Sequence, residues 1–336
     1  MTITVTLPYT SYPIYIERNA LSHIGDYLAL DRRTLIVTDD GVPSSYAEAV
    51  AKAAKAPIVV TLPQGENTKS LESFSKLLGI MLENGFTRHD AVVAVGGGVI
   101  GDLAGFAASS YMRGIDFYNI PTTLLSEVDS SIGGKTAVNY GAIKNPIGAF
   151  YQPKAVVIDP EVLKTLPPRQ IASGLAECIK MALTFDKDLF EFIETTPDPL
   201  SKIDEIIARS LLIKKKVVEE DEKETGLRRV LNFGHTLGHA IESERQHHDL
   251  YHGECVALGM LPMCSEAIRA RLIPLFEKLM LPTHVTFDHN AAILALRHDK
   301  KSTSDAVKCV FVDTIGSYTM KEIPFNTLNT YFDYYR

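Results

Sequence analysis

Short apolar runs rich in β-branched residues alternate with helical stretches through the first half of this chain. The apolar runs are Thr34–Thr38, Ile58–Leu62, Ala91–Val95, Phe117–Ile120 and a last one at Ala155–Ile158. Helical patterns occupy two of the intervals, Ala47–Ala56 and Ser70–Glu83. Parallel strands need long crossover connections, and helices usually supply them. The alternation therefore predicts an α/β layer built on a buried parallel sheet.

After Pro160 the pattern becomes helical. The helical stretches are Gln170–Phe185, Pro199–Glu222, Val230–Ser243 and Gly253–Leu272, and the next strand candidate is Val307–Val312. A chain of 336 residues is too long for one comfortable core, so two domains are expected. We place an α/β domain at residues 1–155 and a mostly α-helical domain at residues 156–336.

The composition argues against several classes of protein. With 34 basic and 41 acidic side chains the net charge is −7, which argues against a nucleic-acid-binding surface. A run of basic residues, Lys214–Lys216, lies on a predicted amphipathic helix, and we expect it to be solvated. The N-terminus lacks the features of a signal peptide, and no uncharged stretch is long enough to span a membrane. Four cysteines without CxxC spacing indicate reduced thiols in a cytoplasmic protein.

A glycine-rich turn follows the third predicted strand. Gly96, Gly98 and Gly101 precede a helical stretch at Asp102–Ser110. Glycines let the backbone approach a phosphate, and a helix N-terminus adds N–H donors and a positive dipole end. The pattern favours a dinucleotide or phosphate site, and a tight turn without a ligand is the alternative. Because the turn does not follow the first strand, Asp39, which ends an earlier strand, is the better candidate for a ribose partner.

A polar segment, Thr122–Thr136, follows the next strand, where the ligand loops of open α/β sheets gather. Its end resembles a P-loop, but the required first glycine is replaced by Asp129, so an ATPase is rejected. Three basic residues, Arg113, Lys135 and Lys144, lie near the glycine-rich region in the sequence. They indicate an anionic substrate.

Two histidines spaced by four residues, His235 and His239, lie in the predicted helix Val230–Ser243. Positions three or four apart share one face of a helix, so counting back places Asn232 and Arg228 on the same stripe. Buried polar groups need partners, so this stripe should face a metal, a ligand or water.

A metal site is one interpretation of these histidines. A carboxylate and two imidazoles are typical ligands of a catalytic zinc with an open position. Glu177, His235 and His252 form a plausible set, and Lys180 shares a helix face with Glu177. His239 is an alternative ligand, and the glutamate of an HExxH motif is missing between the two histidines. The spacing leaves the choice of ligands open.

Many of these segments together resemble the 3-dehydroquinate synthase family of sugar-phosphate cyclases. The matching segments lie between Gln64 and Lys301 and include GGGVIGDLAGFAA, YMRG, VDSSIGGKTAVN, KNPIGAFYQP, LKTLPPRQIASGLAECIK, LNFGHTLGHAIE, HGECVALGM and DKK. The resemblance implies a Rossmann-like nucleotide-binding α/β domain followed by a mostly α-helical domain that binds metal and substrate. It also implies bound NAD, one divalent metal (zinc or cobalt) and a homodimer.

The activity implied by the resemblance is conversion of 3-deoxy-D-arabino-heptulosonate 7-phosphate into 3-dehydroquinate and phosphate, in the shikimate pathway to aromatic amino acids. In that family the reaction proceeds through transient oxidation by NAD, phosphate elimination, reduction, ring opening and aldol closure. The alternatives are a cyclase with a valiolone- or inosose-type product and a metal-dependent polyol dehydrogenase that releases NADH. A non-catalytic NAD-binding regulator is a further alternative, and the intact metal set argues against it.

The resemblance also implies roles for individual residues. Glu177, His235 and His252 would bind the metal. NAD would contact Asp39, Glu66, Lys69, Gly98, Val99, Ile100, Gly101, Asp102, Thr122, Thr123, Lys135, Lys144, Leu163, Lys164 and Thr165. The substrate phosphate would meet Lys135, Asn145, Asn232, His239 and either Lys300 or Lys301. The remaining site residues would be Arg228 and Lys180 at the carboxylate and hydroxyls, Asp129 and Lys144 beside them, and Arg113 from a second subunit.

Overall fold

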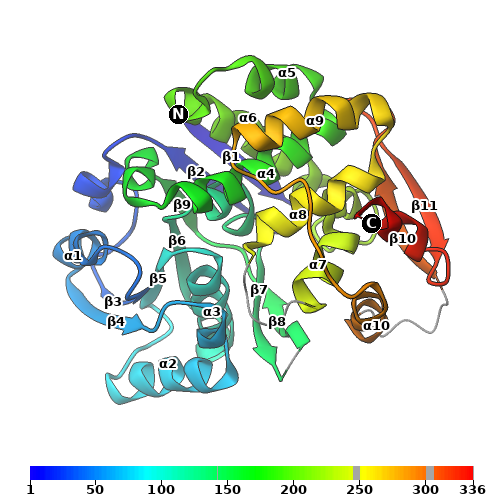
Figure 1. Cartoon of the computed structure of the whole chain (residues 1–336). Coiled ribbons are helices and arrows are strands. Elements are labelled where there is room, and N and C mark those ends of the chain that lie inside the picture. The colour runs from blue at the N-terminus through cyan, green and yellow to red at the C-terminus, as the bar shows by residue number, and fades with distance from the viewer. Residues whose placement is uncertain (142, 245–249, 300–305, 336) are drawn as a thin grey trace. The chain divides into compact units, whose positions relative to one another are not determined.

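The computed structural model describes residues 1–336 except 142, 245–249, 300–305 and 336, and Figure 1 shows its helices and strands. The chain divides into two compact units, Met1–Leu166 and Pro167–Arg336. This division comes later than the expected one after residue 155, because strand β9 (Ala155–Ile158) hydrogen bonds into the sheet of the first unit. No helix in the described part of the chain is long and apolar enough to cross a membrane.

The first unit is built on a seven-stranded sheet with the order β1-β2-β9-β6-β5-β3-β4. Its other strands are β1 (Thr2–Leu7), β2 (Thr10–Ile16), β3 (Arg33–Asp39), β4 (Ala56–Leu62), β5 (Ala91–Gly96) and β6 (Asp116–Pro121). Neighbouring strands run parallel except at the β1–β2 edge. The predicted parallel sheet is confirmed, and every residue of its inner strand β5 is buried.

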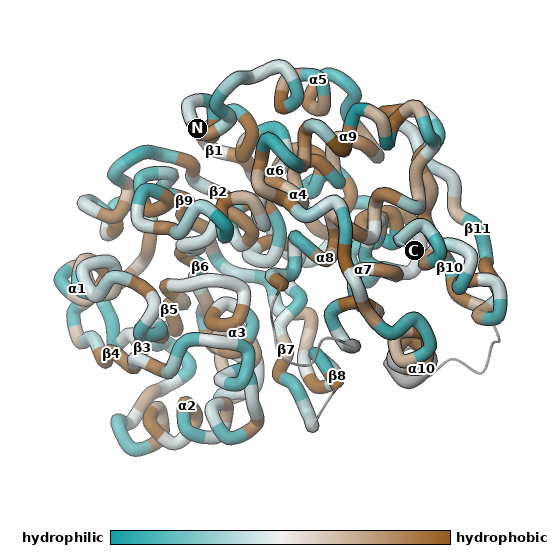
Figure 2. Tube along the Cα trace, in the orientation of Figure 1, coloured by the Kyte–Doolittle hydropathy of each residue, from teal (hydrophilic) through white to brown (hydrophobic). Residues whose placement is uncertain are grey.

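Helices cover both faces of this sheet. They are η1 (Ala20–Asp26), α1 (Ser44–Ala53), α2 (Leu71–Glu83) and α3 (Gly98–Ser110). Successive residues of a strand point to opposite faces, so Val92 of β5 packs with α2 and α3 whereas Val93 packs with α1 and η1. Burial on both faces explains the nearly continuous apolar runs of the strands. Figure 2 shows hydrophilic and hydrophobic segments on α2, as expected of a helix with one side in the core.

Several elements of the first unit were not predicted. β1 and β2 form a hairpin at the sheet edge, and β7 (Lys135–Tyr140) pairs with β8 (Ile143–Phe150) in a separate antiparallel hairpin. These strands lack a continuous apolar run, since β1 alternates exposed and buried residues and β8 is largely exposed. The start predicted for the third helix is also wrong, because α3 begins at Gly98 and the glycine turn forms its first turn.

The second unit is mostly helical, as predicted. Its helices are α4 (Pro168–Phe185), α5 (Lys187–Thr195), α6 (Ile203–Glu220), α7 (His235–Glu244), α8 (His252–Met260), α9 (Glu266–Lys278), α10 (His289–Asp299) and α11 (Asn329–Phe332). β10 (Ala306–Phe311) and β11 (Thr319–Pro324) form an antiparallel hairpin. The single helix predicted for Gly253–Leu272 is wrong, because the extended residue Cys264 separates α8 from α9.

The continuous helix predicted for Val230–Ser243 is also wrong. A 3-10 helix, η7 (Leu227–Asn232), is followed by a break, and α7 begins at His235. Gly234 lies in the break with a φ of 77°, a conformation that glycine adopts without strain. His235 and His239 therefore share α7, whereas Arg228 and Asn232 lie on the preceding segment and not on the predicted stripe.

The basic triplet Lys214–Lys216 differs from its prediction as a solvated face. Lys214 on α6 is buried, with 4% of its surface exposed, and Lys216 is exposed. Lys215 donates to Glu219 over 2.9 Å, one helical turn later. The pattern of charge did not distinguish a buried lysine from its solvated neighbours, because burial here depends on how α6 packs in the second unit.

Candidate active site

A buried carboxylate and two imidazoles converge in the second unit. Glu177 on α4 has no exposed surface, and its Oε1 lies 3.6 Å from Nε2 of His235 and 3.7 Å from Nε2 of His252. Oε1 accepts no hydrogen bond within the described residues, although it is fully buried. A tetrahedral ion with ligand bonds near 2.1 Å separates its ligand atoms by about 3.4 Å. A divalent metal fits this donor set and would satisfy the otherwise unsatisfied oxygen.

The second nitrogen of each imidazole faces an oxygen. Nδ1 of His235 lies 3.2 Å from the carbonyl oxygen of Phe233, and Nδ1 of His252 lies 3.6 Å from Oε2 of Glu242. Metal-bound histidines usually donate their other N–H to such an oxygen, which fixes the ring and leaves Nε2 as the ligand. Both rings therefore have the environment expected of metal ligands.

Burial and nearby charges set the protonation of these rings. Burial lowers the pKa of His235 well below its usual value, and the nearby Lys180 lowers it further. At His252 burial acts in the same direction, but the carboxylates of Glu242 and Glu177 outweigh it and raise its pKa. His235 is thus neutral at physiological pH, the state in which an imidazole can bind a metal.

Lys180 compensates the other oxygen of the candidate metal ligand. Its ammonium donates to Oε2 of Glu177 one helical turn away, and its own exposed fraction is 1%. Two buried charges without partners would be costly, and this pair satisfies one carboxylate oxygen while leaving Oε1 directed at the imidazoles.

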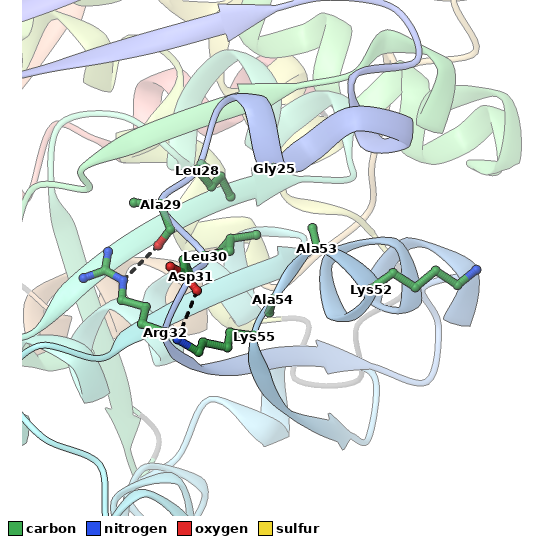
Figure 3. Close-up of a pocket in the computed structure, with 10 residues that line it drawn as sticks. All are labelled: Gly25, Leu28, Ala29, Leu30, Asp31, Arg32, Lys52, Ala53, Ala54 and Lys55. Carbon is green, nitrogen blue, oxygen red and sulfur yellow. Dashed lines mark hydrogen bonds and ion pairs between the residues drawn. The ribbon is translucent and has the colours of Figure 1, made fainter.

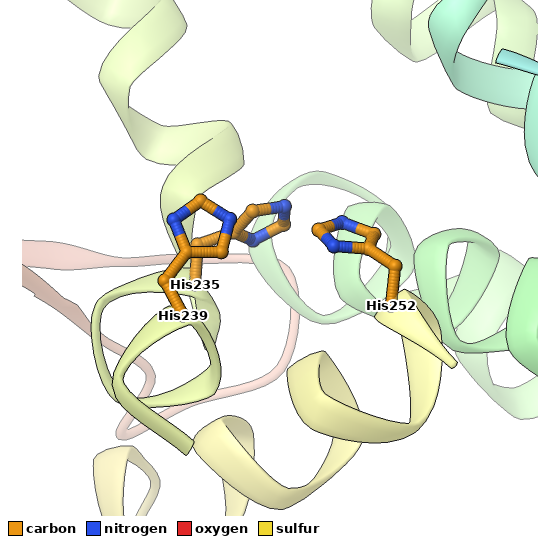
Figure 4. A group of neighbouring side chains, drawn as sticks. All are labelled: His235, His239 and His252. Atoms are coloured by element: carbon orange, nitrogen blue, oxygen red, sulfur yellow. The ribbon is translucent and has the colours of Figure 1, made fainter. Parts of the chain in front are cut away.

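His239 is a neighbour of the same cluster. One ligand atom from each of His235, His239 and His252 lies within 4.8 Å of the others, and Figure 4 shows the three rings facing one another from α7 and α8. Oε1 of Glu177 lies close to two of the same rings, at 3.6 Å from His235 and 3.7 Å from His252. Glu177 and His239 are thus both placed to be the third ligand beside His235 and His252, and the family resemblance implies Glu177.

Glycines allow the helices that carry these ligands to approach closely. A Cβ on Gly253 of α8 would overlap the carbonyl oxygen of Ser173 on α4, and the Gly253 N–H donates to Oγ of Ser173 over 3.0 Å. A Cβ on Gly238 of α7 would lie 2.7 Å from the carbonyl oxygen of Cys255 on α8. Larger residues would push α4, α7 and α8 apart, so these glycines set the distances between the candidate ligands.

An ion pair that the sequence did not reveal holds the start of α8. Arg169 on α4 donates through Nε and Nη2 to the two carboxylate oxygens of Glu254. Glu254 also accepts from the N–H of Tyr251 over 2.7 Å, and the Arg169 guanidinium lies 4.8 Å from the Tyr251 ring centroid. His252 lies between Tyr251 and Glu254 in the sequence, so this network fixes the backbone of a candidate ligand.

The segment before α7 is ordered around another carboxylate. Asp221 accepts hydrogen bonds from the N–H groups of Thr225, Gly226 and Arg228. Burial would raise the pKa of Asp221, but these donors outweigh it and lower the pKa. Arg228 is buried and donates to the carbonyl oxygen of Glu222. In the same segment Asn232 donates to Oε1 of Glu224 over 2.6 Å.

In the first unit the glycine turn forms a cradle for a ligand. Gly97 is the N-cap residue of α3, and it has no side chain that could accept from the N–H groups of the first turn. A Cβ on Gly98 would lie 3.0 Å from Oγ of Ser130, and one on Gly101 would lie 3.2 Å from Oδ1 of Asn119. The side chain of Ile100 lies in the core, so at this position the backbone is what can meet a ligand. A phosphate fits such a turn, where the N–H groups of a helix start are directed at the anion.

The other candidate NAD residues follow the carboxyl ends of parallel strands. Asp39 ends β3 and accepts from the N–H of Gly41 over 2.9 Å. Because β4 lies on one side of β3 and β5 on the other, the crevice at the ends of β3 and β5 is where ligands of such sheets bind. The remaining candidates at this edge follow β4 (Glu66, Lys69), β5 (Val99, Asp102), β6 (Thr122, Thr123) and β9 (Leu163, Lys164, Thr165).

Several of these residues are already paired. Lys69 is buried and donates to Oδ2 of Asp102. Burial raises the pKa of Asp102, and the charge of Lys69 opposes this shift. Lys164 donates to Glu161, and Oγ1 of Thr165 lies 3.0 Å from the Tyr46 hydroxyl.

The candidate substrate residues of the first unit lie in its later segments. Lys135 begins β7, Lys144 and Asn145 lie on β8, and all three are exposed. Asp129 is half-buried in the π-helix Ser126–Ser130. Arg113 is exposed and has a φ of 65°. Lys300 and Lys301 lie outside the described residues.

A shallow groove in the first unit lies elsewhere. Figure 3 shows that residues just before β3 and just before β4 line it, among them Leu30 and Ala54. Its charged rim is paired internally, because Lys55 lies 3.4 Å from Asp31. The groove is at the amino ends of these strands, opposite to the edge that carries the candidate NAD residues.

Comparison with known proteins identifies the family. A model described as 3-dehydroquinate synthase N-terminal matches residues 59–173, and one described as 3-dehydroquinate synthase C-terminal matches residues 174–302. The chain belongs to the 3-dehydroquinate synthase family. The 3-dehydroquinate synthase of Streptococcus suis is 41% identical over 345 residues, covering 96% of this chain and 97% of the relative. The Enterococcus faecalis enzyme is 42% identical over 344 residues, covering 96% of each chain.

Solved structures of other sugar-phosphate cyclases share the fold. A 2-deoxy-scyllo-inosose synthase complexed with carbaglucose-6-phosphate, NAD+ and Co2+ has a TM-score of 0.88 at 26% identity and covers 98% of both chains. The 2-epi-5-epi-valiolone synthase of Streptomyces hygroscopicus, with NAD+ and Zn2+ bound, has a TM-score of 0.88 at 27% identity and also covers 98% of both chains. The predicted fold class is thereby confirmed.

Proposed function

We propose that this chain catalyses the reaction of its family, conversion of 3-deoxy-D-arabino-heptulosonate 7-phosphate into 3-dehydroquinate and phosphate. The observation that carries the proposal is the buried Oε1 of Glu177 facing two imidazole nitrogens at 3.6 and 3.7 Å. Family membership and a parallel sheet with a glycine turn at its carboxyl edge add the second requirement, a place for NAD.

Glu177, His235 and His252 would hold a zinc or cobalt ion. When bound, the metal supplies Lewis-acid polarisation of the substrate's hydroxyl and carbonyl oxygens, and NAD supplies reversible hydride transfer at a ring carbon. Lys180 orients the Glu177 carboxylate by donating to its other oxygen. Phe233 and Glu242 orient the two imidazoles.

The first unit would hold NAD at the carboxyl edge of its sheet. The turn at Gly98 and Gly101 would carry the pyrophosphate, where close backbone approach and a helix start favour an anion. Asp39 would accept from the ribose hydroxyls, as acidic residues at strand ends do in dinucleotide-binding folds. Lys69 and Asp102 would contact the cofactor as an ion pair whose charges neutralise each other.

The basic and amide side chains would bind the anionic substrate. The substrate phosphate would meet Lys135, Asn145, Asn232 and His239, while Arg228 would hold the carboxylate. Charge-assisted hydrogen bonds to phosphate and carboxylate are strong, and the guanidinium offers two parallel donors. We also propose a cytoplasmic homodimer in which Arg113 reaches the partner's site. Light scattering tests the dimer, and kinetics of mixed dimers with Arg113→Ala test the shared site.

A related cyclase is the second candidate, because two such enzymes share the fold over 98% of the chain. It would act on a different sugar phosphate and leave a different carbocycle. The greater identity to enzymes named 3-dehydroquinate synthase, 41 to 42% against 26 to 27%, favours the first candidate.

The test is phosphate release from the heptulosonate phosphate by the purified protein, with catalytic NAD and zinc and with absorbance followed at the NADH wavelength. We expect one phosphate and one 3-dehydroquinate per substrate without accumulation of NADH. Lasting NADH would indicate a dehydrogenase, and turnover of another sugar phosphate alone would indicate a related cyclase.

A further inference from the structure

A hydrogen-bonded cluster in the first unit joins Glu66, a candidate NAD residue, to Asn145, a candidate residue for the substrate phosphate. Its centre is Asn139 on β7, at a bulge where the pairing with β8 shifts between Val138 and Tyr140. The backbone N–H of Asn139 donates to the carbonyl oxygen of Lys69 over 2.8 Å, and an isolated bridge joins it to Ser70. The bulge thus lets the backbone of Asn139 pair with the loop after β4.

The side-chain amide of Asn139 makes two hydrogen bonds of opposite kind. Its Nδ2 donates to Oε1 of Glu66 over 2.7 Å, and its Oδ1 accepts from the backbone N–H of Asn145 over 2.9 Å. A carboxylate can only accept and a backbone N–H can only donate, so the two partners fix the orientation of the amide. The amide therefore connects a carboxylate of the loop after β4 to the backbone of β8.

The backbone of Asn145 is strained. Its φ is 55°, in the left-handed region, and the next residue is Pro146. Non-glycine residues seldom adopt this φ, and a following proline further restricts a residue to extended conformations. Strain of this kind persists where the surroundings hold it, and it concentrates at ligand sites. The hydrogen bond from Asn145 to Asn139 supplies such a hold.

We propose that Asn139 is a positioning residue that couples the cofactor side of the first unit to the conformation of Asn145. The inference rests on the proposed function, with Glu66 among the candidate NAD residues and Asn145 among the residues that would meet the substrate phosphate. Asn139 acts through these two residues and contacts neither ligand. Occupation of the Glu66 loop by NAD then favours the Asn145 conformation that meets phosphate, and the coupling is reciprocal because binding free energies are linked.

Two substitutions separate the two hydrogen bonds. Asn139→Ala removes both, and we expect it to raise the Kd of NAD and the KM of the heptulosonate phosphate by about five- to tenfold each, the scale of one lost hydrogen bond. Asn139→Asp keeps an acceptor for the Asn145 N–H but sets a second carboxylate against Glu66. It should raise the Kd of NAD while the KM, measured at saturating NAD, stays within about twofold of the wild type.

The matched control is Asn84→Ala, which removes a side-chain amide hydrogen bond of 2.8 Å to Ile80 at the end of α2 in the same unit. It should change neither constant. The inference is overturned if Asn139→Ala leaves the Kd of NAD unchanged, or if the Ala and Asp variants raise the KM equally. A wild-type protein that releases no phosphate would overturn the proposed function instead. The Kd of NAD requires no substrate, and an unchanged value in Asn139→Ala would still overturn the inference in that case.

Discussion

The two units hold their candidate functional groups by different means. In the first, the groups follow the ends of parallel strands, on turns that the sheet places at one edge. In the second, they project from α4, α7 and α8, which approach so closely that glycines occupy the contacts. Each unit also pairs a buried lysine with a carboxylate, Lys69 with Asp102 and Lys180 with Glu177. The first carboxylate keeps 18% of its side chain exposed and the second keeps none.

This difference in burial indicates whether the carboxylate of each unit needs a cation besides its lysine. Solvent and Lys69 together compensate the charge of Asp102, so this carboxylate needs no further cation. Glu177 has one oxygen compensated by Lys180 and another, fully buried, that faces two imidazoles without a hydrogen bond. A carboxylate oxygen in that position is stabilised by a metal ion. We therefore expect removal of the metal to abolish the activity that depends on the second unit, and to leave the binding of NAD by the first unit unchanged.

Removal of the metal gives the largest expected contrast. Dialysis against a chelator should lower the rate of phosphate release by about a thousandfold or more, because several kcal/mol of Lewis-acid stabilisation are lost. The Kd of NAD, measured by calorimetry on the same sample, should stay within about twofold of its original value, and zinc should restore the rate. Parallel loss of NAD binding would show that the two units are not independent in this respect.

Gly253→Ala tests whether the close approach of α4 and α8 sets the metal geometry. The added Cβ would overlap the Ser173 carbonyl oxygen, so we expect about a hundredfold weaker zinc binding and a free energy of unfolding lower by about 1–3 kcal/mol. Gly79→Ala on α2 is the control, since nothing lies within 4 Å of its added Cβ. It should be neutral or stabilise by about 0.5–1 kcal/mol. Equal effects of the two changes would refute a geometric role for Gly253.

Arg169→Lys should weaken zinc binding by about tenfold, because a lysine cannot reproduce the two-pronged contact with Glu254 that fixes the backbone beside His252. Competition with a chromogenic chelator measures the affinity. Arg209→Lys offers a matched control in the same unit, where the guanidinium donates to both oxygens of Asp186 at 3.1 and 3.2 Å. Equal loss of zinc affinity in the control would assign the effect to general destabilisation.

Lys69→Met is the corresponding change in the first unit and should have the smallest effect of the four. It leaves Asp102 without its cation, and we expect the Kd of NAD to rise by about five- to tenfold while zinc affinity is unchanged. Fluorescence titration with NAD measures the change, with the exposed Lys52→Met as the control. A change in zinc affinity, with NAD binding unaffected, would contradict the assignment of NAD to the first unit and of the metal to the second.

Elements that depend on local pattern were largely predictable from the sequence. The five parallel strands from β3 to β9 appear within two residues of their expected bounds, because buried strands carry continuous apolar runs. His235 and His239 lie on one helix, as their spacing indicates. Family resemblance supplied Glu177 and His252 as partners of His235, and the distances in the structure are consistent with that set.

Features that depend on contacts between distant segments were beyond local pattern. The break at Gly234 separates Arg228 and Asn232 from the helix, and the close packing of α7 on α8 explains a glycine there, since a Cβ would lie 2.6 Å from the Val256 carbonyl oxygen. Arg169 and Glu254 are 85 residues apart, and nothing in either segment indicates their contact. The bulge at Asn139 likewise depends on the loop after β4.

The most direct test of a metal site formed by Glu177, His235 and His252 is the zinc content of two purified variants, Glu177→Gln and His239→Ala, measured by atomic absorption after equilibration with equal zinc. We expect Glu177→Gln to lose its zinc and His239→Ala to retain about one ion per chain, with an unchanged far-ultraviolet circular dichroism spectrum in both. Retention by Glu177→Gln together with loss from His239→Ala would contradict this site, and would assign the metal to the three histidines.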